Sequence, residues 1–283
     1  MSTTDLPEAA GRRLAAAGWS AALSVSDFAA CLQMGMRPAG IVQGFCVMGW
    51  QRGLYTYGGY GYRQLDYYPC PHGWGVHDPN EQVNGANWEA AALADVWAAG
   101  YNAAHSRMLE EAAARGAHGV IGVIDATKSL IDEHVREFHL VGTAVVLEGA
   151  GPAGPPWSTY LAGAKLVKLF EAGLVPVSVA GAYCQVHVLA SCATEILEHG
   201  RWDATGVVRR GGEVVQLSDA ATQARRLVRE RLRATLGDCS LHGADLQVAG
   251  RGSTHTAVLR GTKVRRVHDV DPLPAPVPTV RLS

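Results

Sequence analysis

The chain has 283 residues, 48% of them hydrophobic and 18% charged, and its formal net charge is −1. This composition supports a buried core, excludes a disordered chain, and allows one large domain or two small ones. The near-neutral charge argues against a protein that binds nucleic acid through a broad basic surface. The six cysteines are too scattered for a secreted disulfide scaffold. The sequence also lacks a run of about 18 apolar residues, the length that would indicate a membrane-spanning helix. We therefore expect a cytoplasmic protein without a membrane-spanning helix.

The first predicted elements are a short helix and an apolar strand. Ser24 and Asp27 are residue types that cap a helix start, and Gly35 stands where a left-handed helix end is favoured. Pro38 prevents the helix from continuing. Residues 39–48, which are apolar and rich in small side chains, then predict a strand.

A Tyr- and Gly-rich insertion, residues 50–87, separates this strand from a long helix. Apolar side chains recur every three or four residues from about residue 88 to 115, which predicts an amphipathic helix that ends at Gly116. Residues 119–125 and 133–146 predict two strands joined as an antiparallel hairpin.

A Gly/Pro-rich linker, residues 149–156, precedes a second set of similar elements. An apolar stripe that includes Leu166 and Leu169 predicts a short helix, which Gly173 closes. Residues 177–188 then predict another apolar strand with many small side chains.

The second long helix is expected from about residue 218 to 236, with Ser218 and Asp219 as its cap. Its arginines, from Arg225 to Arg233, are expected on a solvated face. Two strands follow, and the spaced prolines of residues 269–283 predict an extended tail.

Identical residues recur at fixed spacing in these two sets. Trp19-Ser20 matches Trp157-Ser158 at an offset of 138, which also aligns Gly35 with Gly173, Pro38 with Pro176 and Cys46 with Cys184. Further along, Arg115-Gly-Ala-His118 resembles His242-Gly-Ala-Asp245 at an offset of 127, and Gly142-Thr143 resembles Gly261-Thr262 at 119. We interpret residues 15–148 and 157–268 as two diverged copies of one domain.

The order strand, helix, strand, strand predicts an α+β fold in which each copy forms an antiparallel sheet packed by one long helix and preceded by a short one. Three strands under one helix form a thin unit. Such a unit often buries its open sheet face against another subunit, so we expect a homo-oligomer.

Several strings resemble the YbjQ family: Gly35-Met-Arg-Pro38-Ala-Gly-Ile-Val-Gln-Gly44, Gly116-Ala-His-Gly-Val-Ile-Gly122 and Val141-Gly-Thr-Ala-Val145, in this order around the long helix. The resemblance implies a dodecin-like β-α-β-β subunit that forms cyclic homo-oligomers. It also implies a heavy-metal-binding label, and it supplies no catalytic residues. The second copy departs from the pattern, because Lys263 stands where the family has alanine.

The strongest metal candidate lies in the insertion, where Cys70, His72 and His77 are close in sequence within a Pro/Gly-rich loop. Thiolate and imidazole are suitable ligands for Zn or Cu, and Asp78 would supply a fourth. Paired C-x₂-C spacing is absent, so an ordinary surface or interface loop is the alternative interpretation.

Other histidines and cysteines give weaker signals. Cys184 and His187 are three apart on a predicted strand, which puts them on opposite faces and argues against a nucleophilic pair. His242 and His255 are expected to bracket the second hairpin turn, where they would face each other. His134 and His139 are five apart on a strand and cannot readily share one metal.

The sequence contains no P-loop, nucleophile elbow or HExxH motif. We therefore predict a non-enzymatic, oligomeric binding or scaffold protein, with a divalent metal or small ligand held at subunit interfaces. One alternative is a metal-dependent enzyme that uses the Cys70/His72/His77 loop. A second is a structural subunit of a larger shell or filament.

Overall fold

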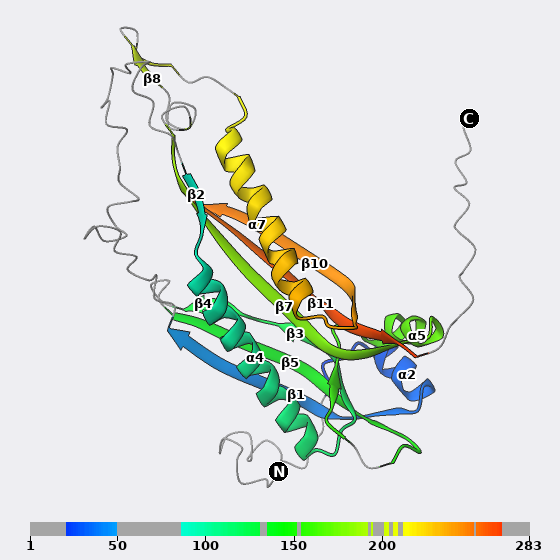
Figure 1. Ribbon diagram of the computed structural model, residues 1–283. Coiled ribbons are helices and arrows are strands. Elements are labelled where there is room, and N and C mark those ends of the chain that lie inside the picture. The colour runs from blue at the N-terminus through cyan, green and yellow to red at the C-terminus, as the bar shows by residue number, and fades with distance from the viewer. Residues whose placement is uncertain are drawn as a thin grey trace, which may run out of the picture.

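The computed structural model describes two large sheets, a two-stranded ribbon and four helices (Figure 1). The described residues are 21–49, 86–130, 135–151, 154–191, 194, 201–203, 206–208, 212–251 and 253–267. This architecture confirms the predicted α+β class. None of the helices in these ranges is long and apolar enough to cross a membrane.

The first half begins with helix α2 (Val25–Gln33). Ser24 Oγ accepts a hydrogen bond from Asp27 N at 3.1 Å, and Gly35 takes a φ of +68° just after the helix. The predicted start and end of this helix are therefore confirmed. The other elements of this half are β1 (Met36–Gly49), β2 (Ala86–Glu89), α4 (Ala91–Ala114), β3 (Gly119–Asp125), β4 (Lys128–Leu130) and β5 (Val135–Leu147).

The second half contains β6 (Trp157–Ser158), α5 (Gly163–Glu171), β7 (Leu174–Leu189), β8 (Arg201–Asp203), β9 (Gly206–Val208), α7 (Val215–Ala234), β10 (Ser240–Arg251) and β11 (Thr254–Arg266). Both long helices were predicted, but the predicted cap of the second by Ser218 and Asp219 is wrong. Helix α7 begins at Val215 and has no side-chain cap. Its first turn is held instead by Gln216, whose Nε2 donates to Leu189 O at 2.8 Å.

Strands β1 and β7 begin earlier than predicted and include Pro38 and Pro176. The β1–β5 ladder shifts register between Pro38 and Gly40, and the β7–β11 ladder shifts beside Pro176. Proline is tolerated at such bulges because its missing N–H removes no regular ladder bond there.

The first sheet has the strand order β1-β5-β3-β6, with β4 also paired to β5, and the second has β10-β11-β7-β2. In each half the first long strand pairs antiparallel with the last strand, which pairs with the strand before it. Each half also lends a short strand to the other, because β2 pairs with β7 and β6 pairs with β3. The two halves are thus joined through both sheets.

The ladders of the two sheets correspond. Ile41 lies opposite Thr143 in the first sheet, and Val179 lies opposite Thr262 in the second. These pairs reproduce the offsets of 138 and 119 found in the sequence. Corresponding residues therefore occupy corresponding places in the two sheets.

Strands β3 and β10 correspond at a different offset from the one predicted. Each has a bulge that contains a glycine of positive φ, Gly122 at +58° and Gly243 at +63°. Gly116, which the sequence matched with Gly243, lies instead in the turn after α4. That match is wrong because the short Gly-Ala motif occurs in two different places in the fold.

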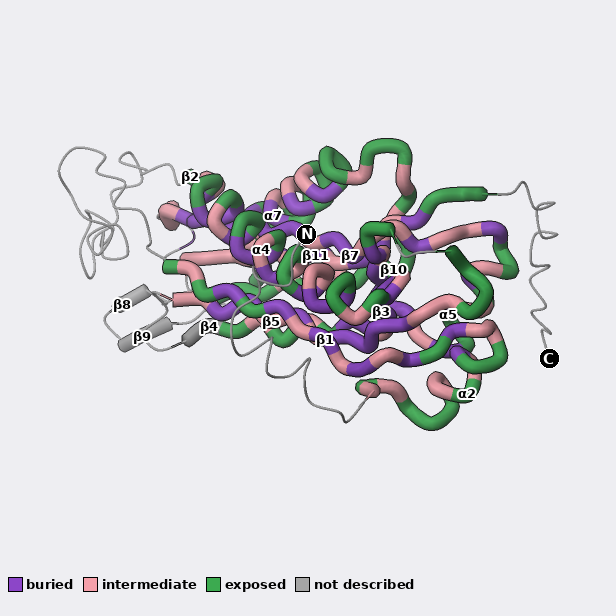
Figure 2. Tube along the Cα trace, turned by 90° about the horizontal axis from the view of Figure 1, so that it is seen from below, coloured by how far each residue is buried: buried purple, intermediate pink, exposed green. Residues whose placement is uncertain are grey.

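Helix α4 lies between the two sheets, and α7 covers the opposite face of the second sheet (Figures 1 and 2). One core joins α4 to β1, β3, β5 and β7, and another joins α7 to β7, β10 and β11. The close approach of α4 to β1 requires Gly44 on β1, where an added Cβ would lie 1.7 Å from Ala104 O on α4. A third cluster packs α2 against α5 through Cys31, Leu166 and Leu169.

Candidate functional site: the polar layer between the halves

The predicted metal ligands Cys70, His72 and His77, with Asp78, lie outside the described residues, as does His134. Within the described ranges, no three His, Cys, Asp or Glu side chains are grouped so that they could hold a metal ion. The polar groups that do gather lie where the first half meets the second.

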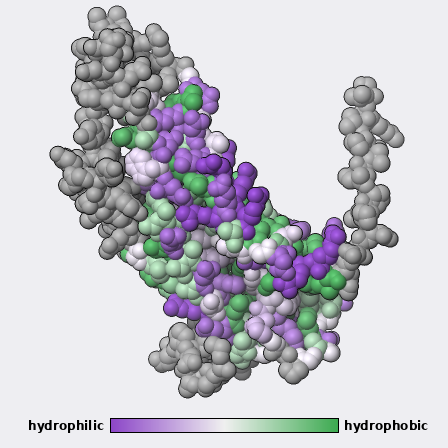
Figure 3. All heavy atoms as spheres, in the orientation of Figure 1, coloured by the Kyte–Doolittle hydropathy of each residue, from purple (hydrophilic) through white to green (hydrophobic). Residues whose placement is uncertain are grey.

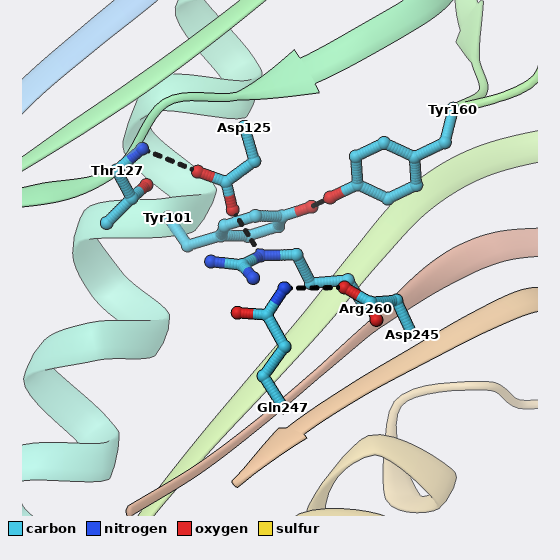
Figure 4. A network of polar contacts seen from close by, with 7 residues as sticks. All are labelled: Tyr101, Asp125, Thr127, Tyr160, Asp245, Gln247 and Arg260. Atoms are coloured by element: carbon cyan, nitrogen blue, oxygen red, sulfur yellow. Dashed lines mark hydrogen bonds and ion pairs between the residues drawn. The ribbon is translucent and has the colours of Figure 1, made fainter. Parts of the chain in front are cut away.

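An ion pair joins the two halves at the centre of this layer (Figure 4). Arg260 Nε on β11 lies 2.5 Å from Asp125 Oδ2 at the end of β3, and the two side chains are 17% and 4% exposed. Asp125 Oδ1 accepts a further hydrogen bond from Thr127 N at 2.8 Å. Both carboxylate oxygens therefore have donors, as a buried charge requires.

Two tyrosines form the second bridge between the halves. Tyr101 on α4 and Tyr160, just after β6, share a hydrogen bond of 2.7 Å between their hydroxyls (Figure 4). Burial raises the pKa of both phenols, and their mutual proximity further raises that of Tyr101. Both hydroxyls therefore stay protonated at neutral pH and are unsuited to act as bases or nucleophiles.

A row of buried polar side chains lies on one face of β7. Tyr183 Oη donates to Gln185 Oε1 at 2.5 Å, and Gln185 Nε2 lies 3.0 Å from His187 Nε2. The guanidinium of Arg136, from the first half, lies 5.2 Å from the centre of the Tyr183 ring. A donating Gln185 amide would make His187 Nε2 the acceptor of this bond, and His187 Nδ1 lies 3.3 Å from Thr254 Oγ1.

An imidazole and a hydroxyl also meet between the halves. His105 Nε2 on α4 lies 2.8 Å from Ser158 Oγ, which accepts a bond from Val179 N at 2.9 Å. Burial, reinforced by Lys263, lowers the pKa of His105 to about 4. Ser158 is fully buried, so no substrate reaches it without a rearrangement of the layer.

Cys184 lies on the other face of β7, toward α7. Its Sγ donates to Glu89 Oε1 at 3.5 Å, and Glu89 is also held by Arg231 Nη2 at 2.8 Å. Burial and, to a smaller extent, the negative charge of the adjacent Glu89 raise the pKa of the Cys184 thiol to about 12. A thiol that keeps its proton is a poor nucleophile and a poor metal ligand.

The structure also tests the predicted histidine and cysteine pairs. Cys184 packs in the α7 core while His187 contacts Gln185 and Trp88, which confirms that the two lie on opposite faces. The expected approach of His242 to His255 is wrong. His242 pairs with Thr262 and His255 with Gly250, at opposite ends of the hairpin, because the two strands stay paired as far as Arg251 and Thr254.

A pocket of about 500 Å³ lies outside this layer, between α2, β1 and the end of α4. Phe28, Leu32 and Pro38 supply apolar walls, and Arg37 and Arg115 supply two guanidinium groups. Arg115 Nη1 donates to Ala39 O at 3.1 Å, while its buried Nε has no hydrogen-bond partner. Two cations beside apolar walls suit a small amphipathic anion.

Sequence reasoning missed the whole polar layer. Asp125 ends a predicted strand and Arg260 lies within a hairpin, so neither belongs to a motif. The polar residues Gln185 and His187 inside an otherwise apolar strand were the one available signal.

Comparison of the chain with known protein families, curated proteins and solved structures finds no match.

Proposed function

We propose that this protein is a non-enzymatic binding or scaffold protein that assembles with copies of itself in the cytoplasm. We further propose that its halves are diverged copies of one dodecin-like subunit of the YbjQ type. Two features support the duplication: the order helix, strand, helix, strand, strand of the elements in both halves once the short strands β2, β4, β6, β8 and β9 are set aside, and the constant offsets of the β1–β5 and β7–β11 ladders. Gly142-Thr143, which is part of one of the three strings that resemble the family, and Gly261-Thr262 occupy corresponding places.

The observation that carries the assembly proposal is an apolar surface, here called the outer face, on the side of the first sheet away from α4. Phe45, Val47 and Ile124 lie on it and are 45%, 46% and 54% exposed. Two of them correspond to Tyr183 and Gln185 in the second sheet, which are 3% and 6% exposed, and Tyr183 packs in the core that α4 forms. An exposed group of large apolar side chains is typical of an interaction site.

The chemistry of the polar layer supports a non-enzymatic role. Its ion pair and its pair of tyrosine hydroxyls join the two halves, and both tyrosines hold their protons. Cys184, on the other face of β7, also holds its proton. A catalytic acid or base requires a pKa near the working pH and access to a substrate. The buried groups of this layer fit a structural lock between the halves better than a reaction centre.

For the binding part of the function, we assign a small amphipathic anion to the pocket lined by Arg37 and Arg115. In the second half the corresponding residues are Val175 and Thr235, so the two cations belong to the first half alone. The fluorescent anion 8-anilinonaphthalene-1-sulfonate is a suitable probe. Arg115→Gln should weaken its binding at least several-fold, and Arg265→Gln, at an exposed arginine elsewhere, should leave it unchanged.

Native mass spectrometry of the full chain tests the assembly. A discrete closed oligomer is expected; a monomer at micromolar concentration overturns the proposal, and an open series of sizes supports a filament or shell instead. Elemental analysis of the wild-type protein and of a Cys70→Ala/His72→Ala variant tests the metal. Stoichiometric Zn or Cu lost in the variant supports metal binding by the loop, and absence of metal from both removes it from the proposal.

A further inference from the structure

We propose that copies of this chain assemble head to tail, with the outer face of one copy packed on α7 and β10 of the next. In this interface the segment Ala21–Leu23, here called the first arm, adds to the free edge of β10. The proposal rests on the self-association proposed above and names its contact surfaces. The contact between the two halves of one chain serves as the template.

The template is head to tail because the two halves present different surfaces to each other. The first half contributes α4, with Trp97 stacked on Tyr183 at 6.2 Å between ring centres. The second half contributes the sheet face that lies opposite α7. Among the described residues, a contact of this kind leaves two surfaces largely uncovered: the outer face of the first half and the face of α7 that carries Arg225 and Arg229. Arg231 on α7 is not part of this uncovered face, because it pairs with Glu89 of the first half. Unused complementary surfaces of this kind join successive copies.

The arms give the second line of evidence. Residues 159–161, the second arm, continue from β6 along the edge of β3 that faces away from β5, where Val123 N donates to Thr159 O at 3.0 Å and Gly122 N donates to Leu161 O at 2.9 Å. The second arm is also fixed to its own sheet, since Tyr160 N donates to Thr262 Oγ1 at 3.2 Å.

The first arm makes the corresponding bond to its own sheet, since Ala22 N donates to Thr143 Oγ1 at 3.0 Å. Ala21 and Leu23, which correspond to the fully buried Thr159 and the buried Leu161, are only partly buried. Within the described ranges the first arm pairs with no strand.

The strand that the first arm would join is β10. It lies at the edge of the second sheet, and most of its residues are exposed. Its bulge at Gly243 matches the bulge of β3 at Gly122, so Gly243 N and Ala244 N correspond to the two donors that the second arm occupies. A free edge with the same bulge is suited to accept the same kind of arm.

The residues across the proposed interface also fit one another. Asp125 and Arg260, the ion pair of the template, correspond to Leu246 and Val141, so an apolar pair replaces a charged one. No buried charge is left without a partner by this exchange.

The sizes of two facing side chains also differ between the template and the proposed interface. An added Cβ at Gly181 would lie 2.7 Å from the Trp97 ring, so a glycine there makes room for a tryptophan. Their counterparts are Gln43, which is larger than glycine, and Leu217, which is smaller than tryptophan.

The experiment uses thiol cross-linking of the full chain. A variant with Ala21→Cys is mixed with a variant with Ala244→Cys, and the mixture is treated with a short bifunctional maleimide. A covalent dimer is expected in the mixture and not with either variant alone, which also controls for the native cysteines. The same dimer band at equal strength in all three samples overturns the interface.

A second pair of variants tests the outer face. Phe45→Glu should shift the oligomer toward monomer by at least tenfold in dissociation constant. Val267→Glu is the matched control and should leave it unchanged, because Val267 is also 53% exposed but its counterpart, Glu148, is exposed in the template. An oligomer that survives Phe45→Glu and gives no specific cross-link overturns this interface and leaves self-association standing. A wild-type monomer overturns both proposals.

Discussion

The ion pair between Asp125 and Arg260 should lock the two halves together, and its removal can be tested one residue at a time. Asp125→Leu leaves the Arg260 guanidinium beside a leucine, and Arg260→Val leaves a carboxylate that is 4% exposed. The replacements are the residues found at the corresponding places, Leu246 and Val141, which form an apolar pair. The double variant therefore copies a combination that the chain already contains.

Breaking one partner of a buried pair typically lowers the free energy of unfolding by about 3–5 kcal/mol, because a charge stays buried without compensation. Arg260 is 17% exposed and retains some access to water, so Asp125→Leu should fall near the lower end, about 3 kcal/mol. This value includes the bond that Asp125 Oδ1 accepts from Thr127 N. Replacing both partners by apolar residues should bring the loss to within about 1 kcal/mol of wild type.

Urea unfolding at pH 7, followed by circular dichroism and by tryptophan fluorescence, measures these differences when the two probes give coincident transitions. The double-mutant cycle should give a coupling of at least about 2 kcal/mol. Additive losses, or single variants that lose less than about 1 kcal/mol, would show that the pair does not hold the halves together.

Three further outcomes are expected. The pKa of His105 is about 4 in the folded state and about 6.5 in the unfolded chain, so between these pH values only the unfolded chain takes up a proton. The free energy of unfolding should therefore fall by up to about 3 kcal/mol from pH 6.5 to pH 4, and urea unfolding of His105→Gln should show a smaller dependence on pH. Gly44→Ala, whose Cβ would clash with the α4 backbone, should lower stability by about 3 kcal/mol in urea unfolding, whereas Gly49→Ala, with no atom within 4 Å, should change it little; equal losses would contradict the close packing. Iodoacetamide at pH 8 should leave Cys184 unlabelled in peptide maps of the folded protein and label it in urea, and rapid labelling when folded would refute its raised pKa.

A strip of hydrophilic side chains along α7 bears on how the proposed interface is built (Figure 3). The predicted solvated arginine face is confirmed for Arg225, Arg226, Arg229 and Arg233, which are exposed. It is wrong for Arg231, which is partly buried and pairs with Glu89. The outer face that would meet this helix is apolar at Phe45 and Val47. Long arginine side chains pack their methylene groups on apolar surface while the charge stays in water. The contact is therefore expected to be more polar at its rim than the one between the halves.

Local signals determined the helices and the approximate strands of this protein. The periodic apolar stripe predicted α4, and Ser24 with Gly35 predicted the ends of α2, because capping and left-handed turns depend on neighbours within a few residues. The fixed offset of 138 was also visible in the sequence, since equivalent places in the fold favour the same residue types. The α+β class followed from the order of these elements.

Tertiary structure alone decided how the elements meet. Asp125 and Arg260 are 135 residues apart, and His105 meets Ser158 across 53, separations at which no periodic pattern links two side chains. The exchange of β2 and β6 depends on which sheet edge lies within reach after the halves pack. The same limit explains why Gly116 was matched with Gly243: a short motif carries residue types, whereas its place in a ladder is fixed by backbone pairing across the sheet.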